Sequence, residues 1–292
     1  MRLKLNLEMA VAKMLPDAKL PWFAVLVVFV STLSGGAQNV IAGSPVLVGK
    51  RVAAGAQMPM HEIDHSDWEE LLEKYVDARG MVNYRGWKAS SAAVQKLDGY
   101  LNHLSSASWN AKTPKEAKLA FWINAYNAVT VKGILREYPT SSIRNHTARF
   151  IGYNIWKDLK LQIGSRVYSL DEIEHDILRK MSEPRIHFAI VCASISCPKL
   201  QPWAFTKEKI DAQLTQSANE FFQDSTKCQF DVAKSEVRLS QILNWFDTDF
   251  GKDRDSQLRF VATYSPRGTR ALLLSGEARV SYLKYDWGLN DQ

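Results

Sequence analysis

Two closely spaced cysteines are the residues of this chain whose types and spacing most directly suggest chemistry. Cys192 and Cys197 lie in the segment RIHFAIVCASISCPKL, where an apolar run leads into a small polar turn followed by Pro198. A thiolate at the end of such a run acts as a nucleophile when a positive charge, a base or a helix N-terminus lowers its pKa. Two neighbouring thiols also form disulfides, and free cysteines are often small core residues. The sequence leaves these three alternatives open.

A catalytic thiol would need a base and a group that orients the base. The candidates are His187 and His175 as bases and Glu174 as the orienting group. If residues 185–192 form a short buried strand, alternation places Cys192 and His187 on opposite faces, which makes His175 the better placed base. The turn CASISC, with Ser196, offers hydroxyl and backbone N–H donors for an oxyanion or a ligand.

Two asparagines add a polar feature to an otherwise apolar helix. Asn124 and Asn127 are three residues apart, so they share one helix face with apolar side chains. A buried carboxamide without partners costs about 1–3 kcal/mol. These side chains therefore either bind the backbone of neighbouring loops or line a ligand pocket together with His187.

The cysteine count and the missing metal motifs limit the other possibilities. The chain has 3 cysteines, so pairing of two would leave one thiol free, and the third is Cys228. Neither CxxC nor HExxH occurs, so the spacing typical of zinc sites is absent. We therefore expect no metal and no cofactor.

The N-terminal segment resembles an export signal. Residues 1–37 contain a weakly basic start, the apolar run PWFAVLVVFVSTL at 21–33, and small residues suited to cleavage. The run is shorter than the roughly 20 residues of a spanning helix, although an uncleaved anchor is the alternative. The sequence thus predicts a periplasmic or secreted protein that contacts a membrane only through residues 21–33, if these are retained.

The charge of the chain is mildly basic and evenly spread. It has 37 Lys and Arg against 31 Asp and Glu, a formal net charge of +6, without a basic run of the kind that marks a nucleic-acid surface. We therefore expect no nucleic-acid partner, and a small molecule or peptide of unknown identity instead.

The remaining pattern predicts one α+β domain. Residues 38–60 read as a linker and 61–292 as a helix-rich globular domain with a small, mostly antiparallel sheet. Helical periodicity is strongest in 113–138, where Thr113 and Glu116 have capping-box spacing. Further helices are predicted at 67–77, 92–105, 169–181 and 206–224, the fourth of these starting with a Ser169–Glu172 capping box, and a hairpin is predicted around Gly164-Ser165.

Five sequence blocks in order resemble the domain of unknown function 547 family. They are FWINAYNAV, SLDEIEHDILR, RIHFAIVCASISCP, LSQILNWFDTDFG and KYDWGLN. The resemblance implies one α+β domain and brings no established reaction. The family is also distantly similar to papain-like or transglutaminase-like folds, in which a central helix carries the nucleophile and a following strand the histidine. That likeness implies Asn124 at the nucleophile position and His187 as the strand histidine, so the usual nucleophile would be missing.

Three functions follow as alternatives. The first is an exported thiol-dependent hydrolase or transferase that acts on amide or thioester bonds through Cys192. The second is a non-catalytic ligand- or peptide-binding module with a polar pocket at Asn124, Asn127 and His187. The third is a thiol–disulfide redox role for Cys192 and Cys197.

Overall fold

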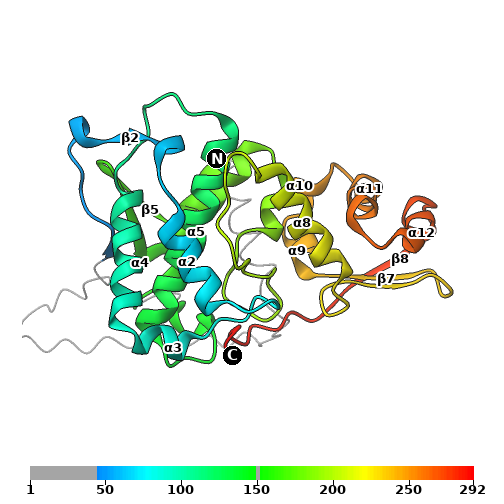
Figure 1. The fold of residues 1–292 in the computed structure, drawn as a ribbon. Helices are drawn as coiled ribbons and strands as arrows, with labels where there is room; N and C mark the ends of the chain where they lie inside the picture. The colour runs from blue at the N-terminus through cyan, green and yellow to red at the C-terminus, as the bar shows by residue number, and fades with distance from the viewer. Residues whose placement is uncertain (1–44, 149–151) are drawn as a thin grey trace, which may run out of the picture. The chain divides into compact units, whose positions relative to one another are not determined.

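The computed structural model describes residues 45–148 and 152–292 (Figure 1). Its α-helices are α2 (Ser66–Tyr75), α3 (Tyr84–Ala89), α4 (Ser91–Leu104), α5 (Lys115–Glu137), α6 (Ile155–Asp158), α7 (Leu170–Glu172), α8 (Ile210–Gln223), α9 (Gln241–Trp245), α10 (Asp247–Phe250), α11 (Arg254–Tyr264) and α12 (Arg270–Leu274). Tighter or wider helical turns are η1 (Ala54–Ala56), η2 (Met60–Glu62), η3 (Ile143–His146), η4 (Ile173–Leu178), η5 (Arg179–Met181), η6 (Pro184–Phe188) and η7 (Arg267–Thr269). The strands are β1 (Val46–Val48), β2 (Met58–Pro59), β3 (Ala107–Ser108), β4 (Leu159–Ile163), β5 (Arg166–Ser169), β6 (Gln229–Asp231), β7 (Glu236–Leu239) and β8 (Arg279–Tyr282).

Helix α5 is the element around which the others pack. Its side chains are buried on nearly every face, which is typical of a helix enclosed by neighbouring elements. Helices α3, α4 and α8 and strand β4 all pack against it. The resulting core supports a helix-rich α+β fold, as the sequence predicted, and it holds the polar side chains of α5 in fixed positions.

The small sheets expected from the sequence are present, and their strand pairing is mixed. In the described residues β4–β5 and β6–β7 pair antiparallel, whereas β1–β4, β2–β3 and β7–β8 pair parallel. The hairpin β4–β5 was predictable because its turn at Gly164-Ser165 is local. The parallel partners are distant in sequence and give no such signal.

The first described strand lies within the segment predicted as a linker. Strand β1 (Val46–Val48) pairs with β4, and Val48 is buried in the core. Gly43–Gln292 form one compact unit. Most of the predicted linker therefore belongs to this unit, because strand β4 offers β1 an edge that the local sequence does not reveal.

Two local expectations fail and one is confirmed. The capping box of Ser169 and Glu172 is present. The one expected at Thr113 is absent, because α5 begins one residue after Pro114 and the Thr113 hydroxyl donates to the Ala111 carbonyl instead. Residues 185–192 do not form a strand. The 3-10 helix η6 (Pro184–Phe188) covers the first four of them, so strand alternation does not apply to His187 and Cys192.

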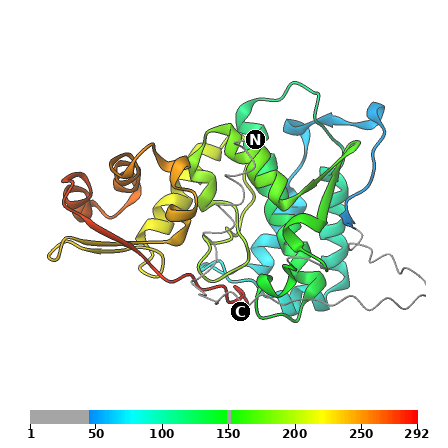
Figure 2. The same ribbon diagram turned by 180° about the vertical axis from the view of Figure 1, so that it is seen from behind.

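The C-terminal segment returns to the first helices of the unit. After β8 it runs back towards α3, as both views of the ribbon show (Figures 1 and 2). The Val82 N–H donates to the Asn290 carbonyl at 2.8 Å, and the Tyr84 hydroxyl donates to the Asn290 side chain at 2.9 Å. This return path carries residues 284–290 past the cysteines.

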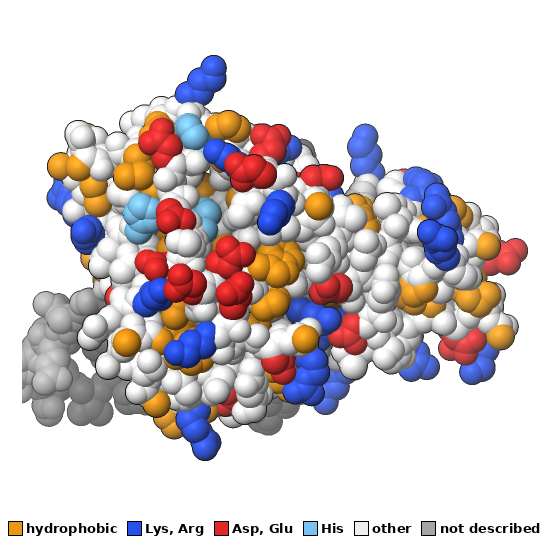
Figure 3. Space-filling model, in the orientation of Figure 1, with side chains coloured by type: hydrophobic (Ala, Val, Ile, Leu, Met, Phe, Trp, Pro, Cys, Tyr) orange, Lys and Arg blue, Asp and Glu red, His pale blue; other side chains and the backbone are white. Residues whose placement is uncertain are grey.

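Acidic and basic side chains lie among one another on the face drawn in Figure 3. Within residues 45–148 and 152–292, no helix is both long and apolar enough to cross a membrane. The predicted signal or anchor at residues 1–37, including the run 21–33, lies outside the described residues.

Candidate functional site

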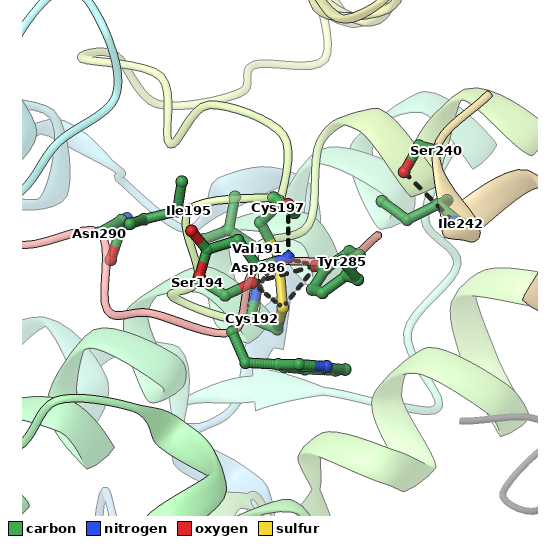
Figure 4. The surroundings of a disulfide bond; sticks show 12 residues. Val191, Cys192, Ser194, Ile195, Cys197, Ser240, Ile242, Tyr285, Asp286 and Asn290 are labelled. Carbon is green, nitrogen blue, oxygen red and sulfur yellow. Dashed lines mark hydrogen bonds between the residues drawn. A yellow bond between two sulfur atoms is a disulfide. The ribbon is translucent and has the colours of Figure 1, made fainter. Parts of the chain in front are cut away.

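The cysteine loop is shaped by an unusual backbone conformation directly after Cys192. Ala193 has φ of +55°, in the left-handed region that residues with a Cβ seldom adopt. A turn follows, in which the Cys197 N–H donates to the Ser194 carbonyl at 3.0 Å. The chain thereby folds back, and Cys192 and Cys197 are joined by a disulfide, as one of the sequence alternatives predicts (Figure 4). Cys228 is a free and buried thiol.

Polar hydrogens converge on the two sulfurs. The Cys192 N–H donates to Cys197 Sγ at 3.0 Å, and the Tyr285 hydroxyl donates to the same sulfur at 3.2 Å. On the other sulfur, Cys192 Sγ, the Ser194 hydroxyl lies at 3.2 Å and that of Tyr285 at 3.3 Å (Figure 4). Disulfide sulfurs carry no proton, so a hydroxyl that bonds to one is the donor. Tyr285 has a single hydroxyl hydrogen, which serves one sulfur at a time, and its oxygen also lies 3.0 Å from the Ser194 hydroxyl. These groups would stabilise negative charge on either sulfur.

Tyr285 is held in place by aromatic packing. Its ring centroid lies 4.7 Å from that of Trp245 in α9 and 4.5 Å from that of Trp287. Burial raises the pKa of Tyr285, so its hydroxyl remains protonated at neutral pH and able to donate. The packing thus fixes a neutral donor beside the disulfide.

Residues 284–290, called the C-terminal strap below, pair with the cysteine loop through backbone hydrogen bonds. The Ile195 N–H donates to the Gly288 carbonyl at 2.8 Å, and Ser194 forms an antiparallel bridge with Leu289. Ser196, predicted as a ligand-binding residue, donates its N–H to the Asp286 carbonyl at 3.1 Å, and its hydroxyl accepts from the Asp286 N–H at 2.8 Å. Ser196 therefore joins the loop to the strap in this structure.

The two cysteine residues differ in their exposure to solvent. Cys197 is only 5% exposed, whereas Cys192 is half-buried. A crevice of about 10 Å³, lined in part by Ser196, Lys227 and Tyr285 but by neither cysteine, has room for roughly one water molecule. Burial lowers the pKa of Lys227, whose ammonium donates to the Ile195 carbonyl. An attacking group would reach Cys192 from the surface.

His187 belongs to a separate buried network. Its Nε2 lies 2.7 Å from a carboxylate oxygen of Asp249, and its ring stacks on Phe246 with a centroid distance of 4.2 Å. Arg179 donates to both oxygens of Asp249, at 2.6 and 2.8 Å. Burial would raise the pKa of Asp249, but the hydrogen bonds from His187 and Arg179 outweigh it and lower that pKa. The carboxylate is thus charged and paired.

His175 and Glu174 border the same network without reaching the sulfurs. His175 Nδ1 lies 3.1 Å from Arg179, and Glu174 accepts a hydrogen bond from the Tyr126 hydroxyl at 3.1 Å. Burial, and then the Glu174 charge, raise the pKa of Tyr126. In the described part of the chain, neither histidine hydrogen-bonds to Cys192. The structure brings His175, His187 and Asp249 together through Arg179, but it does not join them to the thiols.

The paired asparagines bind backbone, as the first of their two interpretations expects. Asn124 Nδ2 donates to the Phe205 carbonyl at 2.8 Å and its Oδ1 accepts from the Phe205 N–H at 2.9 Å. Asn127 donates to the Ala189 carbonyl and accepts from the Val191 N–H, both at 2.9 Å. Asn127 therefore fixes the residue that directly precedes Cys192.

Sequence reasoning missed three residues of this region: Ser194, Asp249 and Tyr285. Tyr285 is 93 residues from Cys192 and Asp249 is 62 from His187, so spacing alone does not connect them. The blocks KYDWGLN and LSQILNWFDTDFG contain both and were the available signal. No cluster of three or more metal-binding side chains occurs among the residues that the structure describes.

Comparison with known proteins gives one match. Residues 110–222 match the model of the family described as Protein of unknown function, DUF547. This part of the chain is therefore similar to that family. Three of the five blocks lie inside the DUF547 match, and the two that contain Asp249 and Tyr285 lie beyond it. No curated protein and no solved structure matches the chain, so the comparisons give no support to the papain-like or transglutaminase-like resemblance.

Proposed function

We propose that Cys192 and Cys197 form a thiol–disulfide exchange site, which passes two electrons between this protein and thiols of a peptide or a small molecule. The convergence of polar hydrogens on the sulfurs carries this proposal. A thiolate is the leaving group in exchange, and donors that stabilise it speed its departure. A disulfide that only braces a loop has no need of such donors.

The difference in exposure gives each cysteine a role. A thiolate of the reduced partner attacks Sγ of the more exposed residue, Cys192, and the electron pair of the broken S–S bond moves to Cys197 Sγ. The Cys192 N–H and the Tyr285 hydroxyl stabilise the departing Cys197 thiolate. A second partner thiol then attacks the partner sulfur bound to Cys192. Two partner thiols become one disulfide, and Cys192 and Cys197 take up the two protons.

The hydrolase or transferase alternative has less support. It requires a free Cys192 thiol with a base beside it, whereas His187 and His175 are bonded to Asp249 and Arg179 among the described residues. Exchange requires no histidine base. We also propose that the protein is exported, since disulfides persist in oxidising compartments, and the apolar run 21–33 is the sequence support for this.

Replacing Tyr285 by Phe tests the proposed role of the donors. We expect glutathione to reduce the disulfide about tenfold more slowly, because loss of one hydrogen bond to a charged group costs about 1.5–3 kcal/mol when the charge is fully formed and less in the transition state. The rate would be followed by quenched alkylation and mass spectrometry. Tyr282→Phe, at an exposed tyrosine of β8, is the matched control. Equal rates for the wild-type and Tyr285→Phe proteins would argue against a role of this hydroxyl.

A further inference from the structure

A second polar cavity lies at the C-terminal end of α5, apart from the residues that bond to the disulfide. It has a volume of about 460 Å³, within the range of roughly 300–1,000 Å³ for small-ligand sites. Its described lining includes Arg136, Glu137, Arg144, His146 and Tyr153. Nothing in the exchange chemistry uses these residues.

The charge of this cavity is positive. Its described lining has two arginines and one carboxylate, that of Glu137. This carboxylate lies 3.6 Å from Arg136 Nε and also 3.6 Å from His146 Nδ1, so it does not serve Arg136 alone. Arg144 has no carboxylate within ion-pair distance among the described residues. Its guanidinium instead lies 5.3 Å from the ring centroid of Trp287. An anion in the cavity would therefore meet a cation that has no ion-pair partner among the described residues.

A buried hydroxyl adds a second argument. The Tyr153 hydroxyl is buried and has no hydrogen-bond partner within the described part of the chain. Its ring lies under the Arg136 guanidinium at 4.8 Å, so the tyrosine is fixed in place. Burial raises the pKa of Tyr153 to about 12, and the hydroxyl is therefore a neutral donor. A buried donor without a partner costs free energy that a bound acceptor would recover.

We propose that this cavity binds a small anion, with Arg136 and Arg144 as its charge partners and the Tyr153 hydroxyl as a hydrogen-bond donor. The ligand chemistry is a carboxylate or phosphate group, because guanidinium groups bind both in bidentate geometry. The cavity volume suits a small organic acid or a phosphate ester.

Isothermal titration calorimetry with inorganic phosphate and, separately, with citrate tests the proposal. We expect at least one probe to bind, and the tighter one identifies the preferred group. Arg144→Gln should weaken binding at least tenfold. Tyr153→Phe keeps the ring under Arg136 and should weaken binding about fivefold without lowering the melting temperature, since the Tyr153 hydroxyl has no hydrogen-bond partner among the described residues.

Two controls separate this site from its surroundings. Arg267→Gln changes an exposed arginine outside the cavity and should bind as wild type. The Cys192→Ser/Cys197→Ser double variant should also bind as wild type, so the result does not depend on the exchange function. The proposal is overturned if neither probe binds, or if Arg144→Gln and Tyr153→Phe both retain wild-type affinity.

Discussion

The Cys197→Ser protein is expected to form a stable mixed disulfide at Cys192 with glutathione disulfide, whereas the Cys192→Ser protein reacts at least tenfold more slowly. The reason is that Cys192 is only half-buried, whereas Cys197 is almost fully buried, with 5% of its surface exposed. Both variants should lose catalytic exchange by at least about 100-fold, because the cycle needs a second thiol to resolve the mixed disulfide. Intact-mass and peptide mass spectrometry locate the adduct.

Cys228 provides an internal control for that experiment. It is buried, burial raises its thiol pKa to about 12, and it should remain unmodified in every variant. Equal modification of the two single variants would contradict the roles assigned to Cys192 and Cys197. Modification of Cys228 under the same conditions would show that the fold had opened.

The Asn127→Ala protein is expected to lose about 3–5 kcal/mol of unfolding free energy. Asn127 is 2% exposed, and its removal leaves the Ala189 carbonyl and the Val191 N–H buried without partners. Each such group costs about 1–3 kcal/mol, and the cavity adds to this. The loss is a large share of the 5–15 kcal/mol typical of a folded protein. Urea unfolding measures it directly.

The control for this stability experiment is an exposed asparagine. Asn110 is exposed, and Asn110→Ala should change the unfolding free energy by less than about 0.5 kcal/mol. A loss below about 1 kcal/mol for Asn127→Ala would mean that the two hydrogen bonds contribute little. The position of the loop before Cys192 would then have to depend on other contacts.

The parts of the fold that sequence predicts are those with local signals. Helix α5, the β4–β5 hairpin and the Ser169–Glu172 capping box each depend on residues within a few positions of one another. Strand β1 was missed because its partner β4 is more than a hundred residues away, so its role in the sheet cannot be read from its own sequence.

The error at residues 185–192 has a specific physical cause. The apolar run favours a buried strand, yet Pro184 begins a 3-10 helix whose cap is Glu183, and the Glu183 carboxylate accepts from the Arg185 N–H. Asn127 then fixes the backbone on either side of Ile190. Tertiary hydrogen bonds thus determine a conformation that periodicity does not encode.

The candidate site was predictable only in part. The spacing of Cys192 and Cys197 is sufficient to propose their disulfide, and the helix positions of Asn124 and Asn127 to propose their burial. One donor to the sulfurs, the Tyr285 hydroxyl, comes from the C-terminal segment, far along the chain from the cysteines. Such a contact depends on tertiary packing, so a single sequence does not reveal it.

A redox titration of the wild-type protein tests the exchange function most directly. The protein is equilibrated in thiol–disulfide buffers of graded potential, and the oxidised fraction of Cys192 and Cys197 is counted by alkylation and mass spectrometry. Because donors to the thiolate stabilise the reduced pair, we expect a midpoint between about −270 and −120 mV, the range of exchange proteins. A pair that is still fully oxidised at about −300 mV, as structural disulfides are, would contradict the proposed function.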